Sequence, residues 1–503
     1  MPAEILVSRS PGETRVALIE DQRLVEFDLE RDDHRSVVGN IYRARVSRVL
    51  PGMQAAFLDI GLERAAFLYV DDIALARDPE DVAEDEGDDE SAEAVDGEDP
   101  PLSDRPPIQD LLEVGQELTV QVRKAPFGTK GARVTNYVTL PGRFVVYLPT
   151  LDRIGVSRKI TDEAERKRLK ELLELHRLPG EGGFIARTMC QGLPDDTIRR
   201  DMEFVRSLWS EVEERVHVKN VPSLLQADLD LVLRTARDLF TEAIDKLVCD
   251  DASEADRIRR LVIVHDPELA QRVEVHREPT DLLASRGALE ALESATRRTV
   301  RLRSGGSLVF DEAEALTAID VNTGRYVGKK DLEQTILKTN LEAAETVAAQ
   351  IRLRNIGGLI IIDFIDMQED DSRHQVFERF TEAMSRDRVK THILPMTEFG
   401  LIELTRKRAR PSLSRKLDEI CPYCGGRGRI RSKESQCLEI LREVRRTAEI
   451  HPSGSLWVSA MPEVARVLSE SPHLLTLESM LGRQIHIESR PDYHQESFHV
   501  TLR

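Results

Sequence analysis

The chain has 503 residues, which is enough for about three or four domains with cores of their own. Its formal net charge is −19, but residues 78–99 alone hold thirteen acidic residues and no basic one, so the remainder carries −6. This overall charge excludes nucleic-acid binding through a generally basic surface. Contacts with nucleic acid are therefore expected only from local basic patches.

Cysteine content and hydropathy exclude two further classes of protein. There are five cysteines, an odd number, and only Cys421 and Cys424 are closely spaced, so a disulfide framework is not expected. No apolar run approaches the roughly 20 residues that cross a bilayer, and the amino terminus lacks the hydrophobic core of a signal peptide. These features predict a cytoplasmic protein that has no contact with a membrane.

Short alternating strands between residues 36 and 135 are separated by turn signals such as Pro51-Gly52. The spacing is typical of a five-stranded OB barrel, and the pattern resembles an RNA-binding OB module first described in a ribosomal protein. Phe57 and Phe67 are the candidates for stacking on bases, although a place in the barrel core fits either phenylalanine about as well. The basic residues nearby are Arg43, Arg45 and Arg48.

The acidic run falls inside this barrel pattern. Residues 78–105 combine low hydrophobicity with high charge and end in a proline-rich stretch. Such a composition cannot bury enough apolar surface to fold, so a disordered loop inserted between two strands is predicted.

An apolar strand at 183–186 is followed directly by Arg187 and Thr188. A guanidinium and a hydroxyl side by side at a strand end can hold a terminal phosphate, although the pair is common and the signal is weak. Residues 128–131 lack the spacing of a Walker loop, which argues against a P-loop ATPase.

The most informative stretch is residues 316–366, whose pattern predicts a strand, a helix of about 24 residues and a second strand. The helix is expected to begin at a cap formed by Asp331 and to end at Gly357-Gly358. The second strand is continuously apolar, as is typical of a parallel strand covered on both faces. Since such a crossover makes the two strands parallel, their carboxyl ends are expected to lie side by side.

Each of these strands ends in an aspartate, Asp320 and Asp363, and alternation places Asn322 on the same side as Asp320. Two unpaired carboxylates would repel each other unless a cation lay between them. Carboxylate and amide oxygens suit Mg²⁺, or Mn²⁺, better than zinc. The alternative is that each aspartate merely caps a turn.

Cys421 and Cys424 form a C-x-x-C pair followed by glycines, which is half of a zinc knuckle. Four ligands are needed, so the other pair must come from a second copy of the chain or from Cys437 and a distant histidine such as His451. The first closure is simpler and predicts a homodimer. A thioredoxin-type redox pair is disfavoured, because this motif opens no βαβ unit. Beyond it, residues 434–449 predict an amphipathic helix.

Several of these stretches together resemble the ribonuclease E/G family of bacterial endoribonucleases over essentially the whole chain. The stretches are RTMC at 187–190, LTAIDVNTGR at 316–325, NLEAAETVAAQIRLRNIGGLIIIDFIDM at 340–367 and CPYCGGRGR at 421–429, besides the OB pattern. Because the sequence ends soon after the cysteine motif, it is more similar to the ribonuclease G branch than to ribonuclease E with its long tail.

The resemblance implies roles at matching positions. Asp320 and Asp363 would hold a catalytic Mg²⁺ with Asn322 beside them, and Cys421 and Cys424 would make a zinc link shared between two protomers. The implied 5′-monophosphate site consists of Arg187 and Thr188 with the backbone near Gly142 and Val146. Two basic residues implied to touch RNA are Lys130 and Arg158.

The implied fold is α/β and multidomain, with RNase H-like and DNase I-like parts, an OB barrel, a zinc-knuckle link and a small C-terminal domain. The expected segments are 1–35 with 233–295 (RNase H-like), 36–135 (OB barrel), 136–232 (5′-phosphate sensor), 296–417 (catalytic), 418–432 (zinc link) and 433–503 (small C-terminal domain). The implied activity is Mg²⁺-dependent cleavage of single-stranded, A/U-rich RNA, with ribosomal RNA precursors and messenger RNA as substrates. A catalytically silent RNA-binding scaffold is the alternative.

Overall fold

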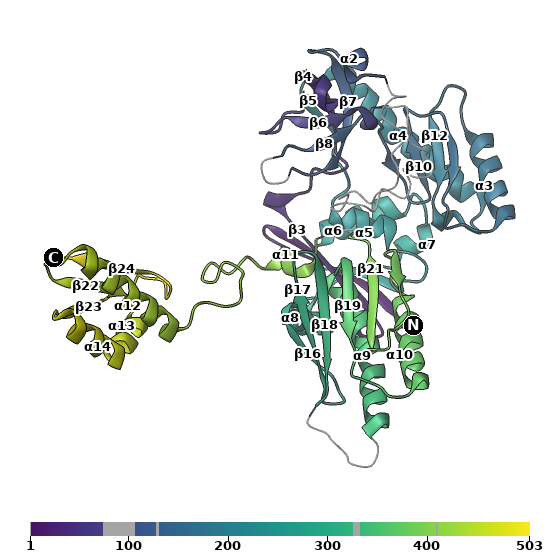
Figure 1. Cartoon of the computed structure of the whole chain (residues 1–503). Helices are drawn as coiled ribbons and strands as arrows, with labels where there is room; N and C mark the ends of the chain where they lie inside the picture. The colour runs from purple at the N-terminus through teal and green to yellow at the C-terminus, as the bar shows by residue number, and fades with distance from the viewer. Residues whose placement is uncertain (1, 74–105, 127–129, 325–331, 409–410) are drawn as a thin grey trace. The chain divides into compact units, whose positions relative to one another are not determined.

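The computed structural model describes residues 2–73, 106–126, 130–324, 332–408 and 411–503 (Figure 1). The acidic insertion predicted at 78–105 and the helix cap predicted at Asp331 lie outside the described residues. The chain divides into two compact units, an N-terminal unit, Met1–Lys416, and a C-terminal unit, Leu417–Arg503. Within the described ranges, no helix is both long enough and apolar enough to cross a membrane.

The N-terminal strands share a five-stranded sheet with a segment that lies more than 200 residues later in the chain. Three antiparallel strands continue into two parallel ones, in the order β15-β14-β1-β2-β3. The strands are β1 Ala3–Ser10, β2 Glu13–Glu20, β3 Arg23–Arg31, β14 Lys246–Cys249 and β15 Val273–Val275. The helices of this segment are α5 Leu231–Asp238, α6 Ala252–Val262, α7 Pro267–Ala270 and α8 Ala288–Thr296.

A closed five-stranded barrel follows, as the alternating pattern predicts. The order β4-β5-β6-β8-β7 closes because β7 pairs again with β4. The strands are β4 Ile41–Leu50, β5 Ala55–Asp59, β6 Ala66–Tyr69, β7 Glu117–Lys124 and β8 Arg133–Thr135, with β13 Ser223–Gln226 added along β4 and the short helix α2 Ile108–Leu111. Gly131 permits the approach of β8 to β6, since a Cβ there would lie 1.9 Å from the Ala65 carbonyl oxygen.

A four-stranded sheet between residues 140 and 186 carries the Arg187-Thr188 pair at the end of one strand. Its order is β11-β12-β10-β9. The strands are β9 Leu140–Pro141, β10 Val145–Leu148, β11 Ile154–Val156 and β12 Gly183–Ala186, and the helices are α3 Glu163–His176 and α4 Asp195–Val218. Both helices pack on the sheet through apolar residues of one core cluster, which leaves the end of β12 free for polar side chains.

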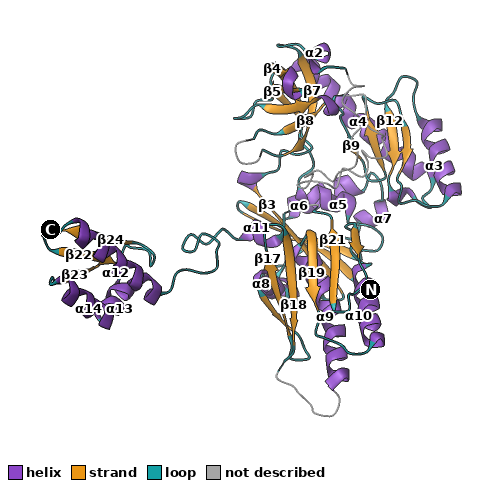
Figure 2. Ribbon diagram, in the orientation of Figure 1, coloured by secondary structure: helices purple, strands orange, loops and turns teal. Residues whose placement is uncertain are grey.

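The sheet that carries the aspartates has six strands in the order β16-β17-β18-β19-β21-β20 (Figure 2). Only β18 and β19 are parallel, and α9 connects them as the sequence predicts. The strands are β16 Thr299–Arg301, β17 Ser307–Glu312, β18 Leu316–Asn322, β19 Gly358–Asp363, β20 Thr391–Ile393 and β21 Leu401–Arg406, and the helices are α9 Leu332–Arg354, α10 Asp370–Met384 and α11 Leu413–Leu417.

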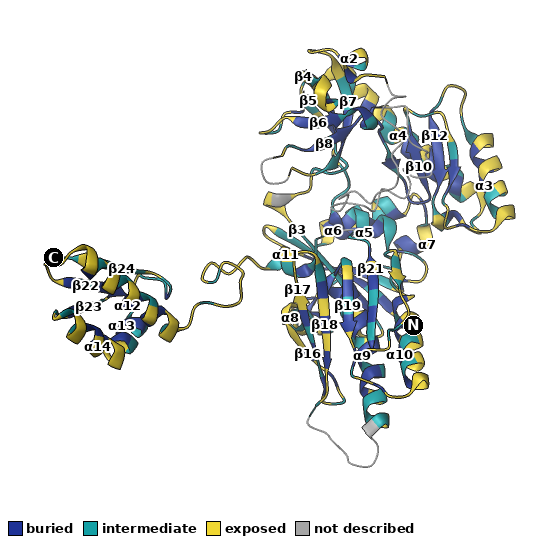
Figure 3. Ribbon diagram, viewed as in Figure 1, coloured by how far each residue is buried: buried dark blue, intermediate teal, exposed yellow. Residues whose placement is uncertain are grey.

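The prediction that β19 is covered on both faces is wrong. Ile360 and Ile362 are buried against the helices, whereas Leu359 on the opposite face is 39% exposed. Figure 3 colours the strands of this sheet by burial. In β18, burial alternates strictly, with Ile319 inside and Asp320 exposed. One face of this sheet is therefore open, and the aspartates lie on it rather than in a dry crevice.

The C-terminal unit is a small α/β fold around a three-stranded sheet, β23-β22-β24, in which β22 and β23 are parallel. The helix predicted at 434–449 is confirmed as α12 Lys433–Ile450, whose side chains Ile440 and Val444 are fully buried. The remaining elements are β22 Leu456–Ala460, α13 Pro462–Ser469, α14 Pro472–Leu481, β23 Ile485–Ser489 and β24 Phe498–Leu502.

Candidate active site

Asp320 and Asp363 lie directly opposite each other on neighbouring parallel strands. Paired residues on such strands are about 4.8 Å apart and point to the same face, so the two carboxylates share one patch of the open sheet face. The prediction that two strands bring these residues together is confirmed. Asp320 lies inside β18 rather than beyond its end, because that strand continues to Asn322.

Asn322 adopts the predicted orientation and contacts Asp320 directly. Its Nδ2 donates to Asp320 Oδ2 at 2.6 Å. A carboxylate can only accept, so the amide nitrogen must face it and the amide oxygen remains available. Gly306 lets β17 approach this end of β18 closely, because any side chain at that position would clash: a Cβ there would lie 2.6 Å from the Asn322 carbonyl oxygen. Asn322 thus orients one carboxylate of the pair.

The two carboxylates of the pair disfavour each other's negative charge. Partial burial, the Asp320 carboxylate and the Asp366 carboxylate together raise the pKa of Asp363 above its ordinary value. Among the described residues, neither Asp320 nor Asp363 forms an ion pair with lysine or arginine. A divalent cation would remove the repulsion, and hard oxygen donors on adjacent strands fit Mg²⁺.

The donor set is small. In the part of the chain that the structure describes, no three histidine, cysteine, aspartate or glutamate side chains cluster into a ready metal cage. Mg²⁺ commonly binds one or two protein carboxylates and keeps several waters or substrate phosphate oxygens. A site with two carboxylates on an open face is of this kind.

Two side chains of α9 fasten the loop that follows Asp363, and the sequence pattern did not single them out. Asn340 is fully buried; its Nδ2 donates to the Ile365 carbonyl oxygen at 2.8 Å, and its Oδ1 accepts from the Ile365 N–H at 3.2 Å. Glu333 accepts from the backbone N–H groups of Gln368 and Glu369. The helix therefore fixes the backbone between Asp363 and α10, including the position of Asp366.

The predicted phosphate site is brought together in part. Arg187 Nη1 donates to the Gly142 carbonyl oxygen at 2.9 Å and to Asp238 Oδ1 at 3.0 Å. Burial of Asp238 would raise its pKa, but Arg237 and Arg187 lower the pKa to about 2, so it stays charged and holds the guanidinium. Arg187 is thus fixed beside Gly142 in a partly exposed position.

Thr188 and Val146 have different surroundings. The Thr188 hydroxyl is exposed and lies 3.2 Å from the Ser157 hydroxyl, a neighbour that the sequence did not indicate. Val146 is buried in the middle of β10, where it pairs with Pro141 and Ile185, so the predicted backbone contact with a phosphate is not accessible at this residue. Arg158 is exposed and directly follows Ser157, which places it near this site rather than in the barrel.

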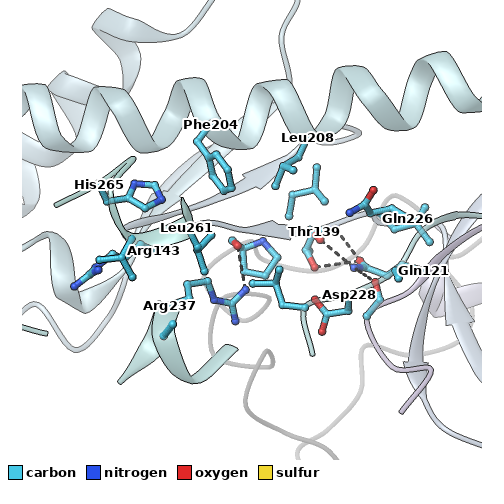
Figure 4. A pocket seen from close by; sticks show the side chains of 18 residues that line it. Gln121, Thr139, Arg143, Phe204, Leu208, Gln226, Asp228, Arg237, Leu261 and His265 are labelled. Atoms are coloured by element: carbon cyan, nitrogen blue, oxygen red, sulfur yellow. Dashed lines mark hydrogen bonds between the residues drawn. The ribbon is translucent and has the colours of Figure 1, made fainter. Parts of the chain in front are cut away.

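A mainly apolar cavity of about 80 Å³ is lined by residues of the barrel, of the segment Thr139–Arg143 and of α4 to α6 (Figure 4). Gln121 bonds Thr139 at one end of it, and His265 and Arg143 lie at the other. Burial lowers the pKa of His265, which keeps this imidazole neutral.

Asp201 accepts from three consecutive backbone N–H groups, those of Arg143, Phe144 and Val145. This carboxylate therefore fixes the loop that carries Gly142.

Phe57 and Phe67 are cross-strand partners on the outer surface of the barrel, with ring centroids 4.4 Å apart. Both are partly exposed and neither belongs to the barrel core, which rules out the core alternative for them. Lys130 is exposed and precedes Gly131, whose backbone lies against Phe67.

The neighbouring arginines are less available than the sequence pattern indicated. Arg43 bonds the carbonyl oxygen of Lys219 at the end of α4, and both Arg43 and Arg45 pair with Glu117. Arg48 is exposed beside Phe57. Of the three, only Arg48 remains a simple candidate for a phosphate contact.

Cys421 and Cys424 lie at one surface loop. The backbone N–H groups of Cys424 and Tyr423, with the Cys424 side chain, lower the pKa of the exposed Cys421 thiol and favour the thiolate that binds metal. Cys437 is in the core of the C-terminal unit, where burial raises the pKa of its thiol. The alternative closure of a zinc site through Cys437 is therefore wrong.

Comparisons with known proteins identify the family of this chain. A model of the ribonuclease E/G family matches residues 139–409, and a model of the RNase E/G thioredoxin-like domain matches residues 420–503. Ribonuclease G of Escherichia coli (strain K12) is 39% identical over 504 residues, which is 100% of both chains. Ribonuclease G of Haemophilus influenzae is 39% identical over 502 residues, which is 99% of each.

A second kind of relative matches over a shorter span. Ribonuclease E of Haemophilus influenzae is 36% identical over 431 residues, which is 86% of this chain and 44% of that protein. The matched regions contain the aspartate pair, Arg187 and the two exposed cysteines. The chain belongs to the ribonuclease E/G family.

Proposed function

We propose that this endoribonuclease is Mg²⁺-dependent and specific for single-stranded, A/U-rich RNA, that it leaves 5′-phosphate and 3′-hydroxyl ends, and that a 5′-monophosphate stimulates it. Ribosomal RNA precursors and messenger RNA are the proposed substrates. The observation that carries the proposal is the register pair Asp320 and Asp363 on an open sheet face, in a chain 39% identical to proteins named ribonuclease G.

We assign the following roles to residues of the chain. Asp320 and Asp363 hold the cation, Asn322 keeps one Asp320 oxygen in place, and Asn340 fixes the loop beyond Asp363. When bound, Mg²⁺ stabilises the negative charge that develops on the phosphodiester in the transition state. Water attacks phosphorus in line with the 3′ oxygen, whose bond breaks, so the phosphate stays on the 5′ end of the downstream product.

The open face suits a single strand. A single strand can lay its backbone along the exposed residues of the sheet while splayed bases stack elsewhere, and Phe57 and Phe67 offer a pair of rings for that purpose. A duplex would present its bases already stacked and would gain nothing from these rings.

Removing divalent cations tests the reaction class. A 5′-monophosphorylated A/U-rich oligonucleotide should be cut in Mg²⁺ and remain intact in EDTA, with excess Mg²⁺ restoring cleavage. Denaturing gels and end-labelling would identify the products. A preparation that binds the oligonucleotide but never cuts it would support the scaffold alternative, and equal cleavage of DNA would indicate a general phosphodiesterase.

The proposed phosphate site is tested by substituting Arg187. Arg187→Ala should abolish the preference for monophosphorylated over triphosphorylated substrates, because it removes the guanidinium fixed by Asp238 and Gly142. Cleavage of a 5′-hydroxyl substrate should be unchanged. The matched control is Arg199→Ala on α4, an arginine paired with Asp196 and Glu203. If Arg187→Ala keeps the preference of the parent, the phosphate site lies elsewhere.

For the cysteine pair we propose a Zn²⁺ shared by two protomers, which makes the protein a homodimer. Two thiolates fill half of a tetrahedral site, and a second copy supplies the other half. Cys421→Ser with Cys424→Ser should give monomers by light scattering and about half an equivalent of zinc fewer per chain by elemental analysis. Cys190, a buried thiol with its pKa raised to about 12, provides the control as Cys190→Ala. Intact dimers of the double variant would contradict the proposal.

A further inference from the structure

The C-terminal unit carries a groove of about 560 Å³ just after the cysteine pair. One segment lines it with Arg427, Arg429, Ile430 and Arg431, together with Gln436, Glu496 and Phe498. The sequence from 427 to 433 holds four basic residues and no acidic one, although the chain as a whole is strongly acidic. A local patch of positive charge is therefore built beside the loop that holds Cys421 and Cys424.

The groove has a fixed frame. Glu496 accepts from the Arg431 backbone N–H at 2.7 Å and pairs with Arg427 at 2.8 Å. Gln495 Nε2 donates to the Arg431 carbonyl oxygen at 2.8 Å. These contacts occupy the Glu496 carboxylate and hold the backbone of the arginine segment against the chain before β24. The entropic cost of ordering this segment when a ligand binds is therefore small.

Arg429 and Arg431 differ from the other arginines of this unit. The unit contains ten arginines, and all of its residues are described. Eight of them have a side-chain partner, either an acidic residue or a backbone carbonyl group. The eight are Arg427, Arg442, Arg445, Arg446, Arg466, Arg483, Arg490 and Arg503. The guanidinium groups of Arg429 and Arg431 alone have no such partner and both side chains are exposed. They are available to an anion from outside the unit.

Other residues of the groove add features that fit a nucleotide chain. Phe498 packs against the core of the unit and is partly exposed at the groove, and an aromatic ring in such a position can contact a base. Gln436 is 1% exposed, and its Nε2 donates to the Glu496 carbonyl oxygen at 2.9 Å, which leaves Oε1 without a partner. A buried acceptor left open at a groove wall is a group that a ligand donor can complete.

We infer that this groove is a second RNA-binding site, in which Arg429 and Arg431 bind phosphates of a single strand and Phe498 stacks on a base. The inference rests on the proposed function in that RNA is the substrate. It adds a site outside the segments that bear the aspartate pair, the phosphate site and the barrel. Its effect is on affinity for long RNA rather than on the chemical step.

The test uses the full chain and a 5′-hydroxyl, fluorescently labelled 30-nucleotide A/U-rich RNA, without added divalent cation. Arg429→Ala with Arg431→Ala should weaken binding about tenfold at moderate salt and reduce the slope of log affinity against log salt by about 1.4. The control Arg445→Ala with Arg446→Ala removes the same charge from paired, exposed positions of α12 and should leave both quantities unchanged. Arg429→Lys with Arg431→Lys should recover most of the affinity.

The outcomes separate this inference from the proposed function. If the parent cuts RNA in Mg²⁺ while the double alanine variant binds with the affinity and salt slope of the parent, the second site is refuted and the nuclease assignment stands. If the parent neither binds nor cuts RNA, both fail. If the double alanine variant changes the oligomeric state in light scattering, the groove is a contact between copies of the chain, which also overturns the inference.

Discussion

Asp320→Asn and Asp363→Asn should each lower RNA cleavage by about 10³-fold or more at saturating Mg²⁺, since a cation that stabilises the transition state by several kcal/mol loses a ligand. Each substitution keeps the size of the side chain and removes one negative charge. Both residues are exposed on the sheet face, so folding should be unaffected, and near- and far-UV circular dichroism would verify this.

The loss should be specific to this pair. Asp311 lies on the same sheet and is paired with Arg298, so Asp311→Asn provides a control with the same chemistry and should retain near-parental activity. Rates measured over a range of Mg²⁺ concentrations would show whether a variant needs more cation or fails at every concentration. Activity of either active-site variant close to that of the parent would remove the two aspartates from the mechanism.

The positions of Asp320 and Asp363 were predictable because strand periodicity and the helical crossover between the two strands each constrain them. Strand periodicity aligned Asp320 with Asn322, and the long helix required the two strands to be parallel, which fixed the register partner of Asp363. The same rules could not reveal the open face. An apolar run such as Leu359–Ile362 is consistent with two covered faces, and only the tertiary arrangement shows that both helices of the core cluster pack on one side.

Other functional contacts gave no local signal. Asn340 is a buried residue of the mixed polar and apolar helix α9, where a single asparagine carries no pattern of its own, and its role depends on a loop 25 residues away. Arg43 and Arg45 looked free for RNA, but Glu117, more than 70 residues later, neutralises them. Long-range polar pairing of this kind depends on which strands become neighbours, and a linear pattern does not contain that information.

Asp201 on α4 is the residue whose loss should damage the fold most. It is fully buried, and its two oxygens accept from the backbone N–H groups of Arg143, Phe144 and Val145 at 3.1, 2.6 and 2.8 Å. A Cβ on Gly142 would lie 2.5 Å from Asp201 Oδ2, so the glycine is what lets the loop approach the carboxylate. Three donors and a carboxylate thus satisfy one another in the interior.

Asp201→Ala should destabilise the N-terminal unit by about 3–5 kcal/mol, because three buried N–H groups lose their acceptor and the buried Arg143 guanidinium loses a nearby compensating charge. Unfolding of a multidomain chain is not two-state, so hydrogen exchange of the amides of residues 143–145 is the direct measurement. Their protection should fall by at least 10²-fold, the factor to which about 3 kcal/mol corresponds. The Gly142 carbonyl group would also lose its fixed position beside Arg187, so the preference for monophosphorylated RNA should weaken.

The matched control is Asp196→Ala, one to two turns earlier on the same helix. The Asp196 side chain is 80% exposed and pairs with Arg199, so its removal should cost less than about 1 kcal/mol. Asp201→Asn should be intermediate, because one amide oxygen can still accept while the amide nitrogen faces a donor. If the exchange of residues 143–145 is the same in Asp201→Ala as in Asp196→Ala, the carboxylate does not hold the loop, and the position of Gly142 must depend on the β9–β10 strand pair alone.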